Sequence, residues 1–244
     1  MPRGAAGPEV AASGAVAATA IDWPVTTVRW RPGWRIVPTR FPTVLLYDRV
    51  ADPEDFDALY ELEAMTNDRV RDEVGQIALV PARERLFGPG SGPIMAAFTH
   101  LNPQGSRFSD GSYGVFYAAR HPDTAMAETR HHSARFLAAT AEAPLWLQMR
   151  LYRVTIGGKV ADLRGAARVM PAVLDADDYA SSQAVGKRLR ADGAAGLVYP
   201  SVRHAGGVCL AAFRTTLLRD CLHEAHLEYH WNGEAIDYIT RQVA

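Results

Sequence analysis

The feature that most constrains the fold of this chain is a long alternating segment in the middle of the sequence, residues 145–156. It reads LWLQMRLYRVTI, so Leu145, Leu147, Met149 and Leu151 fall on one side of an extended chain. Apolar residues at every second position are typical of a strand with one buried face. The fold must therefore contain a sheet that other elements cover.

Three segments are predicted to be helices. Residues 121–141 contain many good helix formers, and Asp123 is the expected N-terminal cap. Residues 175–193 form a second candidate, which ends at Gly193. Residues 52–67 carry an apolar stripe at helical spacing and form the third.

The second half of the chain is rich in strand patterns. Gly157 and Gly158 predict a turn after the long alternating segment. Short buried strands are expected at 196–201 and 206–213, and a hairpin with an Asn-Gly turn is expected at 225–239. Because strands and helices do not alternate regularly, we expect an α+β fold with a mixed sheet and surrounding helices.

Composition restricts the class of protein. The 244 residues are 48% hydrophobic and 22% charged, with a formal net charge of −1, so no basic field points to nucleic acid. No apolar run is long enough to predict a membrane span. We expect a flexible lead-in at 1–22 and a single domain at 23–244. With only Cys209 and Cys221 and no export signal, a reducing cytoplasm is expected.

Polar residues that could bind an anion and a cation lie in the segment GSRFSDGSYGVFY and in the helix after it. Arg107 stands in a loop rich in Gly and Ser, and a guanidinium makes paired bonds to phosphate. Tyr117 ends a short strand and could form a pocket wall. Glu128 has small and apolar neighbours, so its carboxylate need not lie in open water. Taken singly, such residues are more often solvated or packing residues.

The order of these residues resembles the central signature of the RES-domain toxins, a family named for its arginine, glutamate and serine. The signature has an Arg before a loop, a strand that ends in Tyr and two small residues, and P-x-T-A-x-x-E at the start of a helix. Arg107, Tyr117 and Glu128 match these positions, although Phe108 stands where many members have Trp. The resemblance covers about residues 28–215.

Two further pieces of the signature occur in the same order. The segment SSQAVG contains Ser181 and Ser182, and either could be the family serine. A further family arginine follows an aromatic residue near the start of the domain. Arg35 in GWRIV fits that position, and Arg40 in TRFP is a weaker candidate. Compared with short members, the chain has an insert at about residues 50–100.

The resemblance implies an ADP-ribosyltransferase-like fold that consumes NAD⁺ as a substrate, with no bound cofactor. Such an enzyme cleaves the nicotinamide–ribose bond, and the acceptor can be water, inorganic phosphate or a protein side chain. The protein would then be an NAD⁺ glycohydrolase, an NAD⁺ phosphorylase or an ADP-ribosyltransferase. The family also implies the toxin of a toxin–antitoxin pair with an Xre-like antitoxin as partner. A catalytically silent protein-binding module is the alternative outside enzymes.

The resemblance also assigns roles to individual residues. Glu128 would face the ribose that becomes cationic as nicotinamide leaves. Arg107 and Arg35 would hold the diphosphate, and Tyr117 would stack beside the nicotinamide. The family serine would bind a ribose, a phosphate or the nicotinamide amide.

Two histidines follow Glu128 on the same predicted helix. His131 and His132 come three and four residues later, so either could lie near the carboxylate or line the pocket. The segment VYPSVRHAGG contains Tyr199, Ser201 and Arg203 and could form another edge of the pocket, but a plain turn is the preferred prediction.

The C-terminal histidines do not predict a metal site. Cys221, His223, His226 and His230 lack the H-E-x-x-H pattern. Strand alternation would place Cys221 and His223 on one face and the other two histidines on the opposite face.

Overall fold

The computed structural model describes residues 22–41, 46–49 and 74–243. The helix expected at 52–67 and residues 1–21 of the expected lead-in lie outside this part. The strands are β1 (Val25–Pro38), β2 (Phe116–Ala119), β3 (Leu145–Asp162), β4 (Gly196–Pro200), β5 (Val208–Ala212), β6 (Leu218–Trp231) and β7 (Ile236–Val243). The helices are α2 (Leu46–Arg49), η1 (Ile77–Leu79), η2 (Ala82–Glu84), α5 (Gly92–Thr99), α6 (Pro122–Ala139), α7 (Ala166–Val169), η3 (Pro171–Leu174), α8 (Ala180–Ala191) and η4 (Thr215–Leu217).

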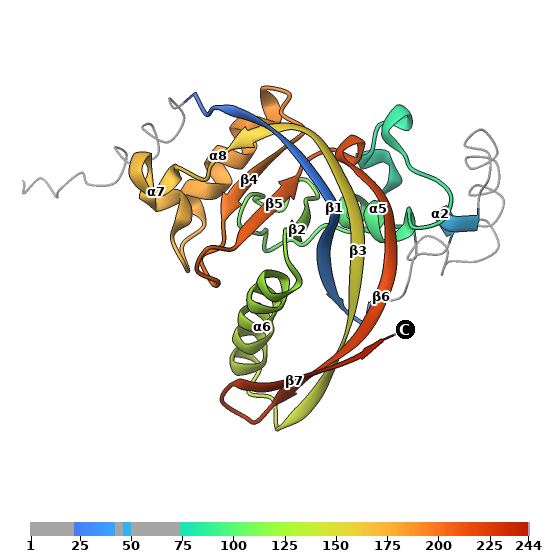
Figure 1. Ribbon diagram of the computed structural model, residues 1–244, viewed down its shortest axis with the longest axis vertical. Helices are drawn as coiled ribbons and strands as arrows, with labels where there is room; N and C mark the ends of the chain where they lie inside the picture. Colours follow the sequence, from blue (N-terminus) through green and yellow to red (C-terminus); the bar gives the residue numbers. More distant parts are fainter. Residues whose placement is uncertain (1–21, 42–45, 50–73, 244) are drawn as a thin grey trace, which may run out of the picture.

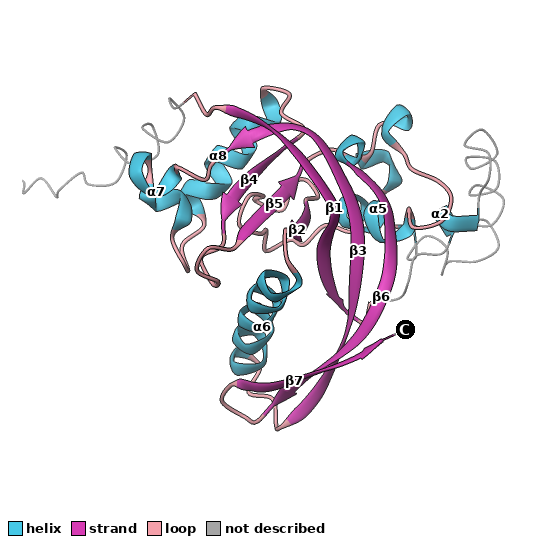
Figure 2. Cartoon of the chain, in the orientation of Figure 1, coloured by secondary structure: helices cyan, strands magenta, loops and turns pink. Residues whose placement is uncertain are grey.

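The strands form one mixed sheet in the order β1-β2-β5-β4-β3-β6-β7. β3 and β4 are parallel, and the other paired strands are antiparallel. β1 also pairs with β3, so β1, β2, β5, β4 and β3 close a ring from which β6 and β7 extend. β3 and β6 form a long arc with α6 on its concave side (Figure 1). The expected α+β fold with a mixed sheet and surrounding helices is confirmed (Figure 2).

The expected turn at Gly157 and Gly158 was wrong, because both residues lie inside β3. They pair with Arg29 and Val28 of β1. Gly158 has φ +148°, and a Cβ atom there would lie 2.5 Å from the side chain of Leu217. Glycine is strongly favoured in this backbone conformation, and with it β3 continues to Asp162 and pairs with β4.

The start of each long helix differs from the sequence expectation. His121 is the N-cap of α6 and Pro122 its first residue, so Asp123 lies in the first turn and is not the cap. Its carboxylate still lies at the favourable end of the helix dipole.

The stretch before α8 is a loop, although it was predicted to be helical. The Oδ1 atom of Asp175 accepts hydrogen bonds from the backbone N–H groups of Asp177 and Asp178, at 2.9 and 2.8 Å. Such local bonds compete with helical ones. The helix therefore begins only at Ala180.

The C-terminal hairpin is confirmed, with Asn232 and Gly233 between β6 and β7. The register between β3 and β6 shifts beside Glu224, which adds one residue to β6. As a result the rings of His223 and His226 lie 4.4 Å apart between centroids. Their expected separation onto opposite faces was wrong, because the bulge interrupts the alternation.

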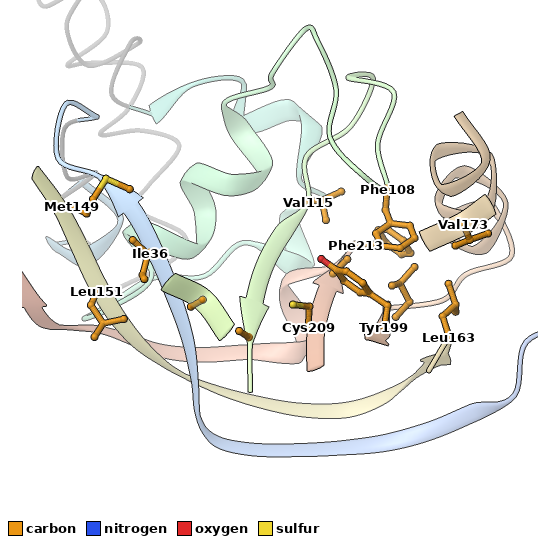
Figure 3. Close-up of a cluster of buried hydrophobic side chains, with 14 of the residues drawn as sticks. Ile36, Phe108, Val115, Met149, Leu151, Leu163, Val173, Tyr199, Cys209 and Phe213 are labelled. Carbon is orange, nitrogen blue, oxygen red and sulfur yellow. The ribbon is translucent and has the colours of Figure 1, made fainter. Parts of the chain in front are cut away.

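Two apolar clusters cover the two faces of the sheet. Figure 3 shows part of the first, in which the rings of Phe108 and Tyr199 meet edge to face at 4.9 Å. The second lies beside α5 and contains Phe116. Since adjacent strand residues point to opposite faces, β2 buries Phe116 in the second cluster and packs Tyr117 against the first. None of the described helices is long and apolar enough to cross a membrane.

Candidate functional site

A cavity of about 420 Å³ lies where β1, β2 and α6 meet the loops before β2 and α8, and we call it the Glu128 cavity. Its lining includes residues that the sequence predicted from widely separated segments: Arg35, Arg107, Tyr117, Glu128 and His132. The volume lies in the range of small-molecule sites. The closed ring of strands therefore brings most of the predicted site residues to one place.

Glu128 is largely buried, with 16% of its side chain exposed. Ser201 Oγ donates a hydrogen bond of 2.6 Å to its Oε1 atom. The thiol of Cys209 lies 3.8 Å from the same oxygen, and burial next to Glu128 raises the pKa of this thiol above its ordinary value. Cys209 therefore remains a neutral donor. Among the described residues, the Oε2 atom has no closer partner than His132 Nε2 at 3.9 Å, so it is the oxygen best placed to meet a ligand.

Arg107 is buried and faces the same cavity, with 6% of its surface exposed. Its Nη1 atom donates to the backbone oxygen of Asp175 at 2.7 Å, and its guanidinium carbon lies 4.5 Å from the centre of the Tyr179 ring. Its Nη2 atom is buried and has no hydrogen-bond partner within the described residues. A buried donor without a partner is costly, so a ligand atom is expected to accept from it.

Arg35 also has a buried N–H group without a described hydrogen-bond partner. It comes from β1, donates from Nη1 to the backbone oxygen of Tyr117 at 3.0 Å, and lies 4.4 Å from the centre of the Phe116 ring. Its Nε atom is buried and finds no acceptor in the part of the chain described. Burial lowers the pKa of Arg35 from its ordinary value, which reflects the cost of keeping this cation away from water. A bound anion would offset that cost.

Tyr117 holds the loop that carries Arg107. Its hydroxyl group contacts Ser106 Oγ at 2.8 Å and accepts a bond of 2.9 Å from the backbone N–H of Phe108. Burial raises the pKa of Tyr117 to about 12, so the hydroxyl stays protonated at neutral pH. The structure thus gives Tyr117 a positioning contact in addition to its place in the cavity wall. Stacking on nicotinamide remains a prediction.

The two histidines of α6 differ in their surroundings. His132 lines the cavity, but half of its side chain is exposed. Partial burial lowers its pKa below 6.5, against the opposite effect of Glu128. His131 does not line the cavity, and its Nε2 atom is buried without a described partner. Burial and the charge of Arg203 lower its pKa as well. Both pKa shifts therefore favour the neutral form of the ring.

Besides His131, three residues predicted from sequence do not line the Glu128 cavity. Ser182 is completely buried, and its Oγ atom donates to the backbone oxygen of Tyr179 at 3.0 Å. Ser181 is half-buried on the same helix. Arg40 is exposed, and its guanidinium group lies over the rings of Phe41 and Phe136. The substrate-binding roles predicted for the serines remain predictions.

Two residues of the site were not chosen as site residues from the sequence. Ser201 belongs to the predicted turn, yet it holds Glu128 and also accepts from the backbone N–H groups of Arg203 and His204 at 3.1 and 3.0 Å. Tyr179 lines the cavity next to Arg107, and its hydroxyl is buried with no described partner. No local pattern marks either residue, because each meets its site partner across about 70 residues of sequence. Among the described residues, no group of three or more His, Cys, Asp or Glu is arranged to hold a metal.

Comparison with known proteins defines the class to which this site belongs. The chain belongs to the RES-domain family, since the family's sequence model, described as "RES domain", matches residues 83–232. The match begins inside the segment expected as an insert, and it leaves β1 with Arg35 ahead of it.

The chain is also similar to two individual proteins. The "Uncharacterized protein y4oC" of Sinorhizobium fredii (strain NBRC 101917 / NGR234) is 30% identical over 214 residues, which cover 84% of this chain and 85% of the relative. A more distant structural likeness is to a chain in the "Crystal structure of the M.tuberculosis MbcT-MbcA toxin-antitoxin complex". It has a TM-score of 0.44 and 14% identity, and it covers 89% of this chain and 87% of the other.

Proposed function

We propose that the protein is an enzyme that consumes NAD⁺ and cleaves its nicotinamide–ribose bond in the Glu128 cavity. The proposal is supported by one observation above all. A largely buried carboxylate shares a cavity with two guanidinium groups, and each of these has a buried N–H without a described acceptor. NAD⁺ carries a cationic pyridinium–ribose end and an anionic diphosphate, so its charges match this arrangement. Membership of the RES family and the ADP-ribosyltransferase-like fold that it implies support the same activity.

In the proposed reaction, Glu128 acts on the charge of the ribose. When the C1′–N bond breaks, its electron pair goes to the pyridinium nitrogen, so nicotinamide leaves as a neutral molecule. Positive charge then develops on C1′ and the ring oxygen of the ribose. A carboxylate beside that ribose gains attraction as the charge arrives, which lowers the barrier. Ser201 fixes the orientation of the carboxylate through Oε1 and leaves Oε2 for the sugar.

Arg107 and Arg35 would hold the diphosphate in this reaction. Their unused N–H groups, Nη2 and Nε, are the donors that a phosphate oxygen would satisfy. Both guanidinium groups are fixed by a backbone oxygen and by an aromatic ring, so little order is lost on binding. The neutral His132 beside Glu128 does not compete with the developing cation.

The acceptor completes the reaction at C1′. Water gives ADP-ribose, and its oxygen loses one proton to solvent. Inorganic phosphate attacks through an oxygen that carries no proton and gives ADP-ribose 1″-phosphate. We propose hydrolysis or phosphorolysis as the main activity, with transfer to a protein side chain as the alternative. On the family resemblance we also propose that the protein is the toxin of a pair, neutralised by an Xre-like antitoxin.

The test incubates purified protein with NAD⁺, with and without phosphate, and identifies the products by mass spectrometry. Release of nicotinamide is expected, and Glu128→Gln should lower its rate by about a hundredfold or more while Ser201 keeps an acceptor. Glu234→Gln, at an exposed position in the β6–β7 turn, is the matched control. Unchanged turnover in Glu128→Gln would remove the assignment of Glu128. Complete inertness of the wild type would favour the silent binding module. Labelling of a lysate protein by labelled NAD⁺ would favour the transferase.

A further inference from the structure

A second cavity, of about 440 Å³, adjoins the Glu128 cavity. We call it the α5 chamber, because Ala96 and Ala97 of α5 form part of its wall. The two cavities meet at a shared set of lining residues: Arg35, Asn102, Gly105, Ser106 and Tyr117. A ligand held by Arg35 could therefore extend into either cavity.

The wall of the α5 chamber is held firmly in place. A Cβ atom at Gly114 would lie 2.3 Å from the backbone oxygen of Ala97, so only glycine lets this loop pack so closely on α5. The first turn of α5 is also tied down, because Asp48 Oδ1 accepts from the backbone N–H of Gly92 at 2.7 Å and from Ser91 Oγ at 3.2 Å. The chamber is thus fixed relative to the loop that carries Arg107.

The lining of the chamber suits a neutral planar group. Most of it is apolar or aromatic, and Tyr113, Tyr117 and Tyr152 contribute rings. Apolar and aromatic walls with few polar groups are typical of sites that bind flat heterocycles. Stacking on aromatic rings is open to any base, because every base has a π-face.

Charge distinguishes the chamber from the Glu128 cavity. The described lining of the chamber has no carboxylate and contains Arg35 and Arg150. Arg150 already donates to the backbone oxygens of Phe41 and Thr39, at 3.0 and 3.4 Å, whereas Arg35 keeps its free Nε–H. A pyridinium cation is therefore disfavoured in the chamber and favoured beside Glu128. A neutral base that is attached to an anion at Arg35 fits the chamber.

We propose that the α5 chamber binds the purine base of the adenosine half of the substrate. This inference rests on the proposed function, since it divides NAD⁺ between two cavities. The nicotinamide riboside lies beside Glu128, the diphosphate lies at Arg107 and Arg35, and the adenine lies between α5 and the tyrosine rings.

The first experiment measures binding of adenosine 5′-monophosphate by calorimetry. Ala97→Phe fills the chamber and should weaken binding at least about tenfold. Ala191→Phe, at an exposed position of α8 outside both cavities, should bind like the wild type. If Ala97→Phe does not fold, Ala96→Leu adds less volume and should weaken binding several-fold. Equal affinity in the wild type and a folded filled variant would overturn the proposal, and so would no binding to the wild type.

The second experiment separates this proposal from the proposed function. Nicotinamide mononucleotide contains the scissile bond but no adenosine. If NAD⁺ is consumed, Ala97→Phe should raise the KM for NAD⁺ at least about tenfold and leave kcat/KM for nicotinamide mononucleotide within about twofold. Equal losses with both substrates would contradict a base site. If the wild type consumes no NAD⁺ but still binds adenosine monophosphate in a chamber-dependent way, the proposed function fails and the chamber assignment stands.

Discussion

At the scale of single residues, the site is defined by which polar groups already have partners. The hydroxyl of Tyr117 takes part in two hydrogen bonds, whereas the buried hydroxyl of Tyr179 has none within the described residues. Ser201 satisfies Glu128 and two backbone N–H groups at once. Polar groups with hydrogen-bond partners stabilise the site, and buried polar groups without partners are available to bind a ligand. Replacing one group of each kind should therefore affect stability and binding differently.

The two tyrosines should respond differently to loss of the hydroxyl. Tyr117→Phe leaves the N–H of buried Phe108 without an acceptor and should lower the free energy of unfolding by about 1–3 kcal/mol. Tyr179→Phe breaks no described bond and should change that free energy by less than about 0.5 kcal/mol. Because Tyr179 lines the cavity beside Arg107 and its buried hydroxyl has no described partner, Tyr179→Phe should instead raise the KM for NAD⁺. Urea denaturation and steady-state kinetics test both expectations. Equal destabilisation by the two changes would show that Tyr179 has an intramolecular partner.

Ser201 should affect turnover through Glu128. Ser201→Ala removes the 2.6 Å bond to Oε1 and should lower kcat for NAD⁺ about tenfold, which corresponds to about 1.4 kcal/mol. Ser201→Thr keeps a hydroxyl and should restore most of the rate. Since the same hydroxyl accepts from two backbone N–H groups, urea denaturation of both variants separates a loss of stability from a loss of turnover. Full activity in Ser201→Ala would mean that the bond does not position the carboxylate.

The sequence predicted the residues of the site that stand in a local motif. Arg107, Tyr117 and Glu128 follow one another within a short segment, and their shared cavity is now described. Ser201 and Tyr179 could not be predicted, because only the tertiary fold brings them to Glu128 and Arg107.

At the scale of elements, α8 packs directly on the loop that carries Arg107. A Cβ atom at Gly186 would lie 2.3 Å from the backbone oxygen of Phe108, so the helix and the loop touch through their backbones. The side chain of Gln183 adds a bond of 3.0 Å to the backbone oxygen of Ser106. The position of Arg107 therefore depends on a glycine in a different element.

Gly186→Ala should push α8 away from the loop that carries Arg107. The added methyl group meets backbone that cannot move aside freely, so the change should lower the free energy of unfolding by about 1–3 kcal/mol and raise the KM for NAD⁺. Gly165→Ala is the matched control, since a Cβ there meets no atom within 4 Å and φ is −87°. Chemical denaturation of both variants tests the expectation. Similar stability for the two would show that α8 can shift without cost.

Element boundaries were harder to predict than element types. The long central strand follows from apolar alternation, and the two long helices follow from helix-forming residues and end signals. Gly157 and Gly158 look like a turn, but pairing with β1 extends them into β3. Residues 175–179 look helical, but the carboxylate of Asp175 captures the backbone N–H groups of the first turn. Hydrogen bonds to distant strands or to a nearby side chain decide both cases.

At the scale of the whole molecule, stability should depend on pH through three histidines. Burial lowers the pKa of His131, His132 and His223 below 6.5. Below that pH the unfolded chain binds more protons than the folded one, so the free energy of unfolding should fall as the pH falls. Above pH 6.5 these histidines are mainly unprotonated in both states, so they no longer lower the free energy of unfolding. The shifted aspartates, such as Asp162, act only near pH 3.8 and below.

Urea unfolding at about pH 7.5 and about pH 5.5 tests this expectation in a window that excludes the carboxylates. The wild type should be less stable at the lower pH. Replacement of the three histidines by Gln should reduce the difference between the two pH values. A wild type that is equally stable at both would show that these rings titrate normally in the folded state.

The closure of the sheet by β1 has a consequence for any shortened form of the protein. A chain cut to residues 83–232 would retain Glu128 and Arg107 but lose Arg35. It would also expose most of one side of β3 as an open row of backbone donors and acceptors, which invites strands from other molecules. The smallest piece able to remain monomeric is therefore set by backbone pairing, and it begins well before the stretch that carries the recognisable signature.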